Sequence, residues 1–187
     1  MKQRGFTLME LVITLIVVAI LAVIAFPRLT SLRPEAELAQ AKAVAASFQQ
    51  AVAFAHTRWQ IVSPGKEIVN LPGYVDGVLD LNAAGYPLGI NKNNPMGQAQ
   101  QIGKGDAGCV SLWQTLIVDA PSVALPSNDP DFNADYHAYR HNENGDNNPM
   151  SRCSYVYRAG GDRADRDSAA IVIEYRSEDG SVGVIQR

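Results

Sequence analysis

The hydrophobic pattern divides the chain near residue 27. Residues 6–26 form an almost unbroken apolar run in which Glu10 is the only charged residue. About 20 apolar residues in a helix cross about 30 Å of hydrocarbon, so we predict a membrane-length helix here. Elsewhere in the 187 residues no apolar run approaches that length, and the chain is therefore expected to cross a membrane once.

Helical periodicity resumes after Pro27 and Pro34, two residues that tend to kink or interrupt a helix. Apolar positions then recur at three- and four-residue steps, which places them on one face: Leu38, Ala41, Ala45, Phe48, Val52, Ala55 and Trp59. We expect that face to pack on a globular domain. The opposite positions are expected to be solvated or to face another subunit: Gln40, Lys42, Gln49, Gln50 and Arg58. "SPG" at 63–65 should stop the helix.

The remainder of the chain has short runs that are typical of strands, with turn residues between them. We predict strands at 73–81, 86–90 and 153–160, a short helix at 109–119 and a polar loop at 124–152. The segment 169–187 should form two strands around the Asp179-Gly180 turn, which is a strong hairpin signal. These elements predict the α+β class with a mainly antiparallel sheet.

Length and charge limit the function classes. The chain has room for one domain and an anchor, and its net charge of -3 with a pI near 5.6 argues against a surface that attracts nucleic acid as a whole. Lys2 and Arg4 precede the apolar run, and such basic flanks stay in the cytoplasm. The part that follows is then exported, where Cys109 and Cys153 are expected to pair.

A cleaved secretory signal peptide is the first competing interpretation of the N-terminus, because a basic start and small residues such as Ala22 and Ala25 fit one. Two features count against it. The apolar run is longer than a usual signal core, and Glu10 lies inside it, where a carboxylate costs several kcal/mol.

The segment "RGFTLMELVITLIVVAILAVIAFPRL" at 4–29 resembles the class III signal and N-terminal helix of type IV pilins and pseudopilins. A short basic leader ends at Gly5, and Phe6, the acid Glu10, an apolar helix and the helix-bending Pro27 follow. The resemblance implies the type IV pilin fold, in which a long N-terminal α-helix packs on a mainly antiparallel sheet with a disulfide-bounded C-terminal loop region. Its expected parts are a leader, a transmembrane or filament-core helix, an amphipathic continuation and a globular periplasmic or extracellular head: 1–5, 6–26, 27–62 and 63–187.

The same resemblance implies roles for three residues. Gly5 would precede the bond that an inner-membrane prepilin peptidase cuts, and Phe6 would become the new, N-methylated terminus. Glu10 would be the assembly carboxylate, because an acid in apolar surroundings is tolerated when it is paired and the Phe6 amine of a neighbouring subunit supplies a partner. The expected partners are other pilin subunits in a helical filament, the peptidase, the inner-membrane assembly machinery and, before assembly, the inner membrane.

Within the family, "LNAAGYPLG" and "CVSLWQTLIVDAPSV" are similar to minor pilins of the mannose-sensitive haemagglutinin (MSHA) pilus, most of all to its B-type subunit. That similarity implies a minor subunit of an adhesive pilus at the cell surface. The alternative is a type II secretion pseudopilin, which uses the same leader and helix in a periplasmic pseudopilus. No catalytic cluster is evident, so we expect neither enzymatic activity nor a cofactor.

Between the cysteines lies a polar stretch with oxygen-bearing side chains at alternating positions, as at the start of a calcium loop. The pattern then departs from an EF-hand, which needs Gly where Ala134 stands and Glu where Arg140 stands. We favour a solvated loop, assign no metal, and keep four residues as calcium candidates: Asp129, Asp131, Asn133 and Asp135.

We also consider the histidines and tyrosines of this stretch as functional residues. His137 and His141 are spaced to share a helix face, but no third zinc ligand is evident. Tyr136 and Tyr139 lie among polar loop residues, which makes them candidates for surface recognition. Trp59, by contrast, is expected in the core.

Overall fold

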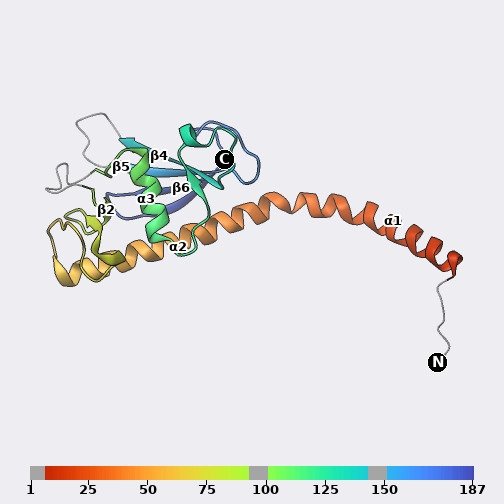
Figure 1. Ribbon diagram of the computed structural model, residues 1–187, viewed down its shortest axis with the longest axis horizontal. Helices are drawn as coiled ribbons and strands as arrows, with labels where there is room; N and C mark the ends of the chain where they lie inside the picture. The colour runs from red at the N-terminus through yellow and green to blue at the C-terminus, as the bar shows by residue number, and fades with distance from the viewer. Residues whose placement is uncertain (1–6, 93–100, 143–150) are drawn as a thin grey trace, which may run out of the picture. The chain divides into compact units, whose positions relative to one another are not determined.

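The computed structural model describes residues 7–92, 101–142 and 151–187, and the chain forms two compact units, Met1–Glu37 and Leu38–Arg187. The first unit holds α1 (Leu8–Ser31) and the start of α2 (Arg33–Val62) (Figure 1). The chain stays helical through Pro27, and the interruption expected near the prolines falls at Leu32. Pro34 then occupies the first turn of α2, where its missing N–H is not needed by the helix.

The second unit combines helices with two sheets. Its five-stranded sheet has the order β3-β4-β5-β6-β7, in which β3 and β4 are parallel and every other pair is antiparallel. A separate two-stranded sheet pairs β1 with β2. The elements after α2 are β1 (Leu79–Leu81), β2 (Pro87–Ile90), α3 (Asp106–Leu116), β3 (Val123–Ala124), β4 (Tyr136–Asn142), β5 (Ser151–Tyr157), β6 (Ile171–Arg176) and β7 (Val182–Gln186), with 3-10 turns at Val75–Gly77 and Pro126–Asn128. The expected α+β class is confirmed.

The main core lies between α2, α3 and one face of the five-stranded sheet. Phe48 of α2 is at its centre, with ring centroids 6.1 Å from Trp113, 5.8 Å from Tyr155 and 5.3 Å from Tyr175. All four side chains are fully buried, and aromatic burial of this kind contributes strongly to a core. The apolar face predicted for α2 is the face that packs here, with Leu38 half-buried at its margin.

The polar face predicted for α2 needs two corrections. Arg58 is half-buried, and its Nε donates to the Pro72 carbonyl at 2.9 Å. Gln40, Lys42 and Gln50 are exposed, but Gln49 is half-buried and binds the hairpin that joins β6 to β7. Its Nε2 donates to the Gly180 carbonyl at 3.2 Å, and its Oε1 accepts from the Val182 N–H at 2.7 Å. Periodicity along one helix could not predict this contact, because it joins residues more than 130 positions apart.

The prediction of a loop at 124–152 was wrong in its centre, where β4 pairs with β5 along seven residues. Tyr136 and Ala138, two residues apart on β4, are both buried in the core. The Asn and Asp residues around them dominate the local composition, so the two-residue strand period is not evident in the sequence. Tyr136 is therefore no surface recognition residue: it is fully buried, with its ring 4.7 Å from Trp113.

The other predictions differ from the structure mainly at element ends. The first predicted strand at 73–81 shrinks to β1, because a 3-10 turn at Val75–Gly77 replaces its first half. The helix predicted at 109–119 is α3, shifted toward the N-terminus by three residues. The C-terminal hairpin is confirmed. Gly180 has φ of +69° there, and a Cβ on it would overlap the Tyr86 ring.

Candidate functional site

The first described turn of the chain positions Glu10. Thr7 is the N-cap of α1, and its Oγ1 accepts a hydrogen bond from the Glu10 backbone N–H at 3.2 Å. Glu10 thus occupies the third helical position, where the positive end of the helix dipole favours a carboxylate. The Thr-x-x-Glu spacing is that of a capping box, a signal in the sequence that identifies Thr7 as the residue that fixes the helix start.

The Glu10 side chain is exposed, and its carboxylate forms no hydrogen bond or ion pair with any residue in the described ranges. Gly5 and Phe6, the expected processing residues, lie outside those ranges. Their roles, and the pairing of the Phe6 amine with Glu10, therefore remain predictions.

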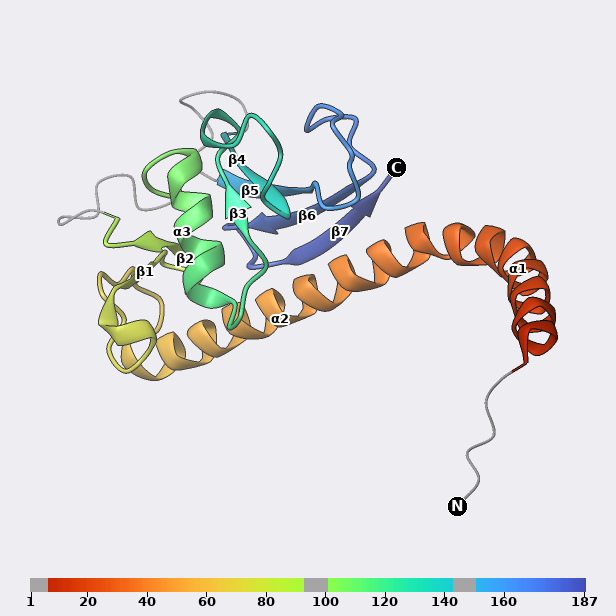
Figure 2. The same cartoon turned by 45° about the vertical axis from the view of Figure 1, so that its right-hand side comes forward.

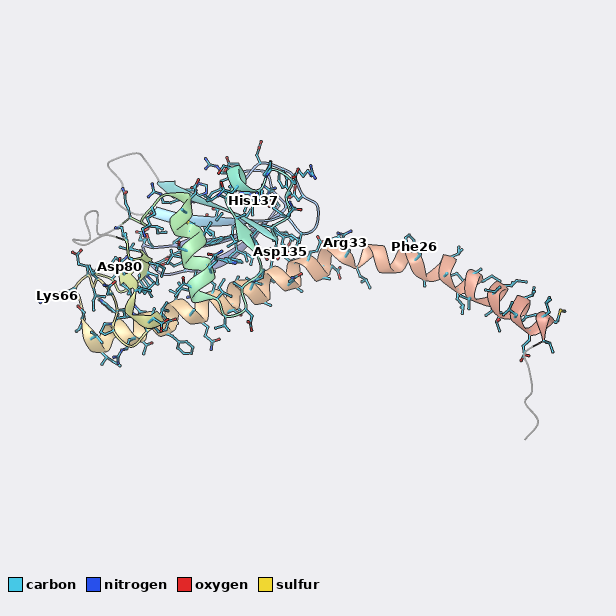
Figure 3. The ribbon with its side chains drawn as sticks, in the orientation of Figure 1. Phe26, Arg33, Lys66, Asp80, Asp135 and His137 are labelled. Atoms are coloured by element: carbon cyan, nitrogen blue, oxygen red, sulfur yellow. A yellow bond between two sulfur atoms is a disulfide. The ribbon has the colours of Figure 1, made fainter. Side chains whose placement is uncertain are left out.

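Around Glu10 the helix is apolar on every side. From Leu8 to Phe26 each large apolar side chain is between 41% and 81% exposed, and Figure 3 shows these side chains projecting from α1. Leu8–Phe26 is the one helix among the described residues that is long and apolar enough to cross a membrane, by length and composition. A helix that is apolar all round and buries nothing within its own chain requires lipid or other helices as its surroundings.

A disulfide joins Cys109 of α3 to Cys153 of β5, with 5.6 Å between their Cα atoms. It links the helix that covers the sheet to a central strand, and it bounds the segment that contains β3 and β4. For a sequence separation of 44 residues, loop closure contributes about 4 kcal/mol in the chain-entropy description. Tyr155, next to Cys153 on the same face, donates from its hydroxyl to the Cys109 carbonyl at 2.9 Å.

The loop before β4 brings together only some of the calcium candidates. Asp129 is buried, and it accepts from the backbone N–H groups of Asn133 and Ala134, each at 2.8 Å. Its Oδ2 also lies 3.1 Å from Nε2 of the buried His137. Asp129 therefore closes its own loop and holds it on β4.

The remaining candidates point elsewhere. Oδ2 of Asp135 accepts from the backbone N–H and the hydroxyl of Ser122, at 2.9 and 2.6 Å, while Asp131 is exposed. Within the described ranges, no three His, Cys, Asp or Glu side chains form a group that could hold a metal ion. No metal is assigned to this loop, and calcium binding by its four candidate residues stays an untested alternative. His137 and His141 lie on a strand, not on the helix face that their spacing suggested.

Asp129 should make the head domain sensitive to acid. The backbone N–H groups of Ala134 and Asn133, with a smaller contribution from His137, lower the pKa of its carboxyl from 3.8 to about 2. A lowered pKa in the folded state gives stability that is fully present above the ordinary pKa and is lost as pH falls through the folded value. For Asp129→Asn we expect a lower free energy of unfolding than wild type at neutral pH, with the difference shrinking from about pH 4 toward about pH 2.

Urea denaturation of the full chain in detergent across that pH range measures the effect. Asp131→Asn is the matched control, because Asp131 is exposed and forms no hydrogen bond or ion pair with a described residue. A wild-type advantage over Asp129→Asn that stayed constant down to pH 2 would contradict the role assigned to this carboxylate.

Comparison with known families decides how the N-terminal geometry is interpreted. Residues 1–26 match the family model described as the prokaryotic N-terminal methylation motif. The chain thus begins with the motif of type IV pilin-like and pseudopilin precursors. Comparison with curated proteins and with solved structures finds no match.

The motif at residues 1–26 indicates how the precursor is handled. It implies processing by a prepilin peptidase and assembly with pilus machinery, and it suggests a structural subunit. The exposed apolar helix fits an anchor in the inner membrane. Minor pilins and pseudopilins share this motif, so it does not distinguish between them.

Proposed function

We propose that the chain is a minor type IV pilin, processed by prepilin peptidase between Gly5 and Phe6 and assembled into an adhesive, MSHA-like pilus. One observation carries the proposal: within a prepilin-type motif, the Leu8–Phe26 part of α1 is apolar on all sides and bears one charged group, the Glu10 carboxylate, which has no partner among the described residues. A helix with these properties suits a filament core, where it exchanges lipid for the helices of other subunits.

The proposed assembly step follows from charge and burial. Cleavage after Gly5 creates a cationic amine on Phe6 beside the apolar helix. As the helix leaves the membrane and packs among others, Glu10 pairs with the Phe6 amine of a neighbouring subunit, because each charge would otherwise be buried alone at a cost of several kcal/mol. The same pairing fixes the axial position of one subunit against the next, and its head-to-tail repetition produces an open helical filament.

The proposed function gives the protein one location before assembly and another after it. Before assembly the apolar helix spans the inner membrane once, with Leu38–Arg187 in the periplasm, an oxidising compartment that suits the Cys109–Cys153 disulfide. After assembly the helix lies in the filament core and the head is displayed on the pilus at the cell surface. The partners are then other pilin subunits, the prepilin peptidase and the inner-membrane assembly machinery.

Deletion of the gene separates the proposed pilus function from that of a type II secretion pseudopilin. We expect the deletion strain to lose adhesion to surfaces and to have fewer or altered pili, while it secretes exoproteins at the wild-type level. Counting pili by electron microscopy, measuring adhesion and assaying a secreted hydrolase in the same cultures test this. Normal adhesion combined with a secretion defect would overturn the pilus assignment and favour the pseudopilin.

A further inference from the structure

The outer edge of β7 is open to another strand. β7 is the last strand of the five-stranded sheet, and among the described residues it pairs only with β6, as Figure 2 shows. The N–H of Arg176 donates to the Ser181 carbonyl, and the N–H of Arg187 donates to the Ala170 carbonyl, both at 3.0 Å. Because hydrogen-bonded pairs alternate in an antiparallel ladder, the backbone groups of Val182, Val184 and Gln186 point away from β6.

Gln49 already occupies the first position of this edge. Its amide accepts from the Val182 N–H and donates to the Gly180 carbonyl. One residue of a neighbouring parallel strand would form the same two bonds through its own N–H and C=O, since these groups bridge the residues on either side of its pairing position. The Gln49 side chain therefore takes the place of the first residue of a parallel neighbouring strand. Its hydrogen bond also confirms independently that the Val182 N–H points away from β6.

The next two outward positions lack such a partner. In the described part of the chain, no residue hydrogen-bonds to the outward backbone groups of Val184 and Gln186. The strand sequence Val-Gly-Val-Ile-Gln contains no charge and no proline, so it lacks the devices that usually protect an edge from strand pairing. Unprotected edges of this kind are the surfaces used in β-strand addition.

A groove of about 360 Å³ runs beside this edge, between β7 and the helix-side residues Lys42, Ala45, Ala46 and Gln49. The two alanines leave room for a further chain above the helix. Lys42 is exposed and has no acidic partner among the described residues, so the groove presents one positive charge and no negative one. A segment that carries a carboxylate would complement it.

We propose that the β7 edge binds an extended segment of another protein chain by parallel β-strand addition, with an acidic side chain of that segment beside Lys42. The incoming backbone continues the ladder that Gln49 begins, and it receives hydrogen bonds from the N–H groups of Val184 and Gln186. Small side chains on its helix-facing side fit over Ala45 and Ala46. This inference does not depend on whether the chain serves a pilus or a pseudopilus.

The test uses the full chain in detergent micelles and the synthetic peptide acetyl-Thr-Val-Thr-Val-Glu-Val-amide as the probe. Titration calorimetry measures the affinity, and hydrogen exchange followed by mass spectrometry measures protection of β7. We expect binding that slows exchange at Val184 and Gln186. Val184→Pro should weaken binding about tenfold or more, because proline removes an outward N–H that β6 does not use. Val184→Thr keeps that N–H and is the matched control.

Charge and backbone chemistry are tested separately. Lys42→Glu should weaken binding of this peptide about threefold or more and favour a peptide with Lys in place of Glu, whereas Lys66→Glu, an exposed change outside the groove, should leave both affinities unchanged. Methylation of alternate peptide nitrogens on the pairing edge should abolish binding.

Three results would overturn the proposal. The first is absence of binding by either peptide at millimolar concentration. The second is binding with equal affinity to the wild type and Val184→Pro. The third is concentration-dependent self-association that Val184→Pro abolishes and the peptide does not compete with, since this would make a second copy the occupant of the edge.

Discussion

Glu10→Ala is expected to leave cleavage of the precursor intact and to remove the subunit from filaments. In the filament core the alanine variant leaves the Phe6 amine of a neighbour without its counter-charge. Removing one partner of a buried ion pair costs about 3–5 kcal/mol, which corresponds to a reduction in incorporation of more than about a hundredfold. Immunoblots of sheared pili and of the membrane fraction, scaled to the same cell mass, give the ratio.

Two matched variants define what the carboxylate contributes. Glu10→Gln preserves size and removes only the charge, so it should fail nearly as severely as alanine. Glu35→Ala removes an exposed acid from the first turn of α2 and should assemble normally. If Glu10→Ala reached the wild-type level in sheared pili, the assembly role proposed for Glu10 would be wrong.

Gly5→Val is expected to stop processing. The proposed cut follows Gly5, and a branched side chain at that position changes the residue that the peptidase must accommodate next to the bond. The precursor should accumulate in the membrane at its full mass, with almost no shortened form and no incorporation. Gln3→Ala changes the leader away from the bond and is the control, which should be cut normally. Intact-mass measurement of the purified membrane protein distinguishes the two forms.

Patterns that are local in sequence predicted much of the fold. The apolar run, the face of α2 that carries Phe48, and the Asp179-Gly180 hairpin each arise from residues within one or two elements, and the structure contains all three. The cysteine pair was predictable for a different reason, because two cysteines in an exported segment have only one intramolecular way to pair.

The features that local patterns could not predict depend on contacts between distant segments. Tyr136 was placed on the surface because of its polar neighbours, yet pairing with β5 turns it into the core against Trp113. Gln49 is a polar residue of the kind found at solvated helix positions. It binds the backbone of β7 only because that strand packs beside α2. Composition describes what surrounds a residue along the chain, whereas burial depends on what packs against it in space.

At the N-terminal site, local sequence patterns predicted some features and missed others. Glu10 was identified from sequence alone because a single acid interrupts an apolar run, and the structure adds its position at a capped helix start. Thr7 was missed, although the Thr-x-x-Glu spacing is a signal for it. The partner expected for the carboxylate belongs to another subunit, and no pattern within one chain describes that contact.

The mass of the N-terminal peptide from the mature protein shows whether the precursor is cut after Gly5, methylated and assembled into filaments. The protein is purified from sheared surface filaments and from membranes, and its N-terminal peptide is sequenced by mass spectrometry. We expect a peptide that begins at Phe6 and carries an N-methyl group, recovered from the filament fraction. A terminus at Met1, or one created by cleavage near Ala25, would contradict this expectation.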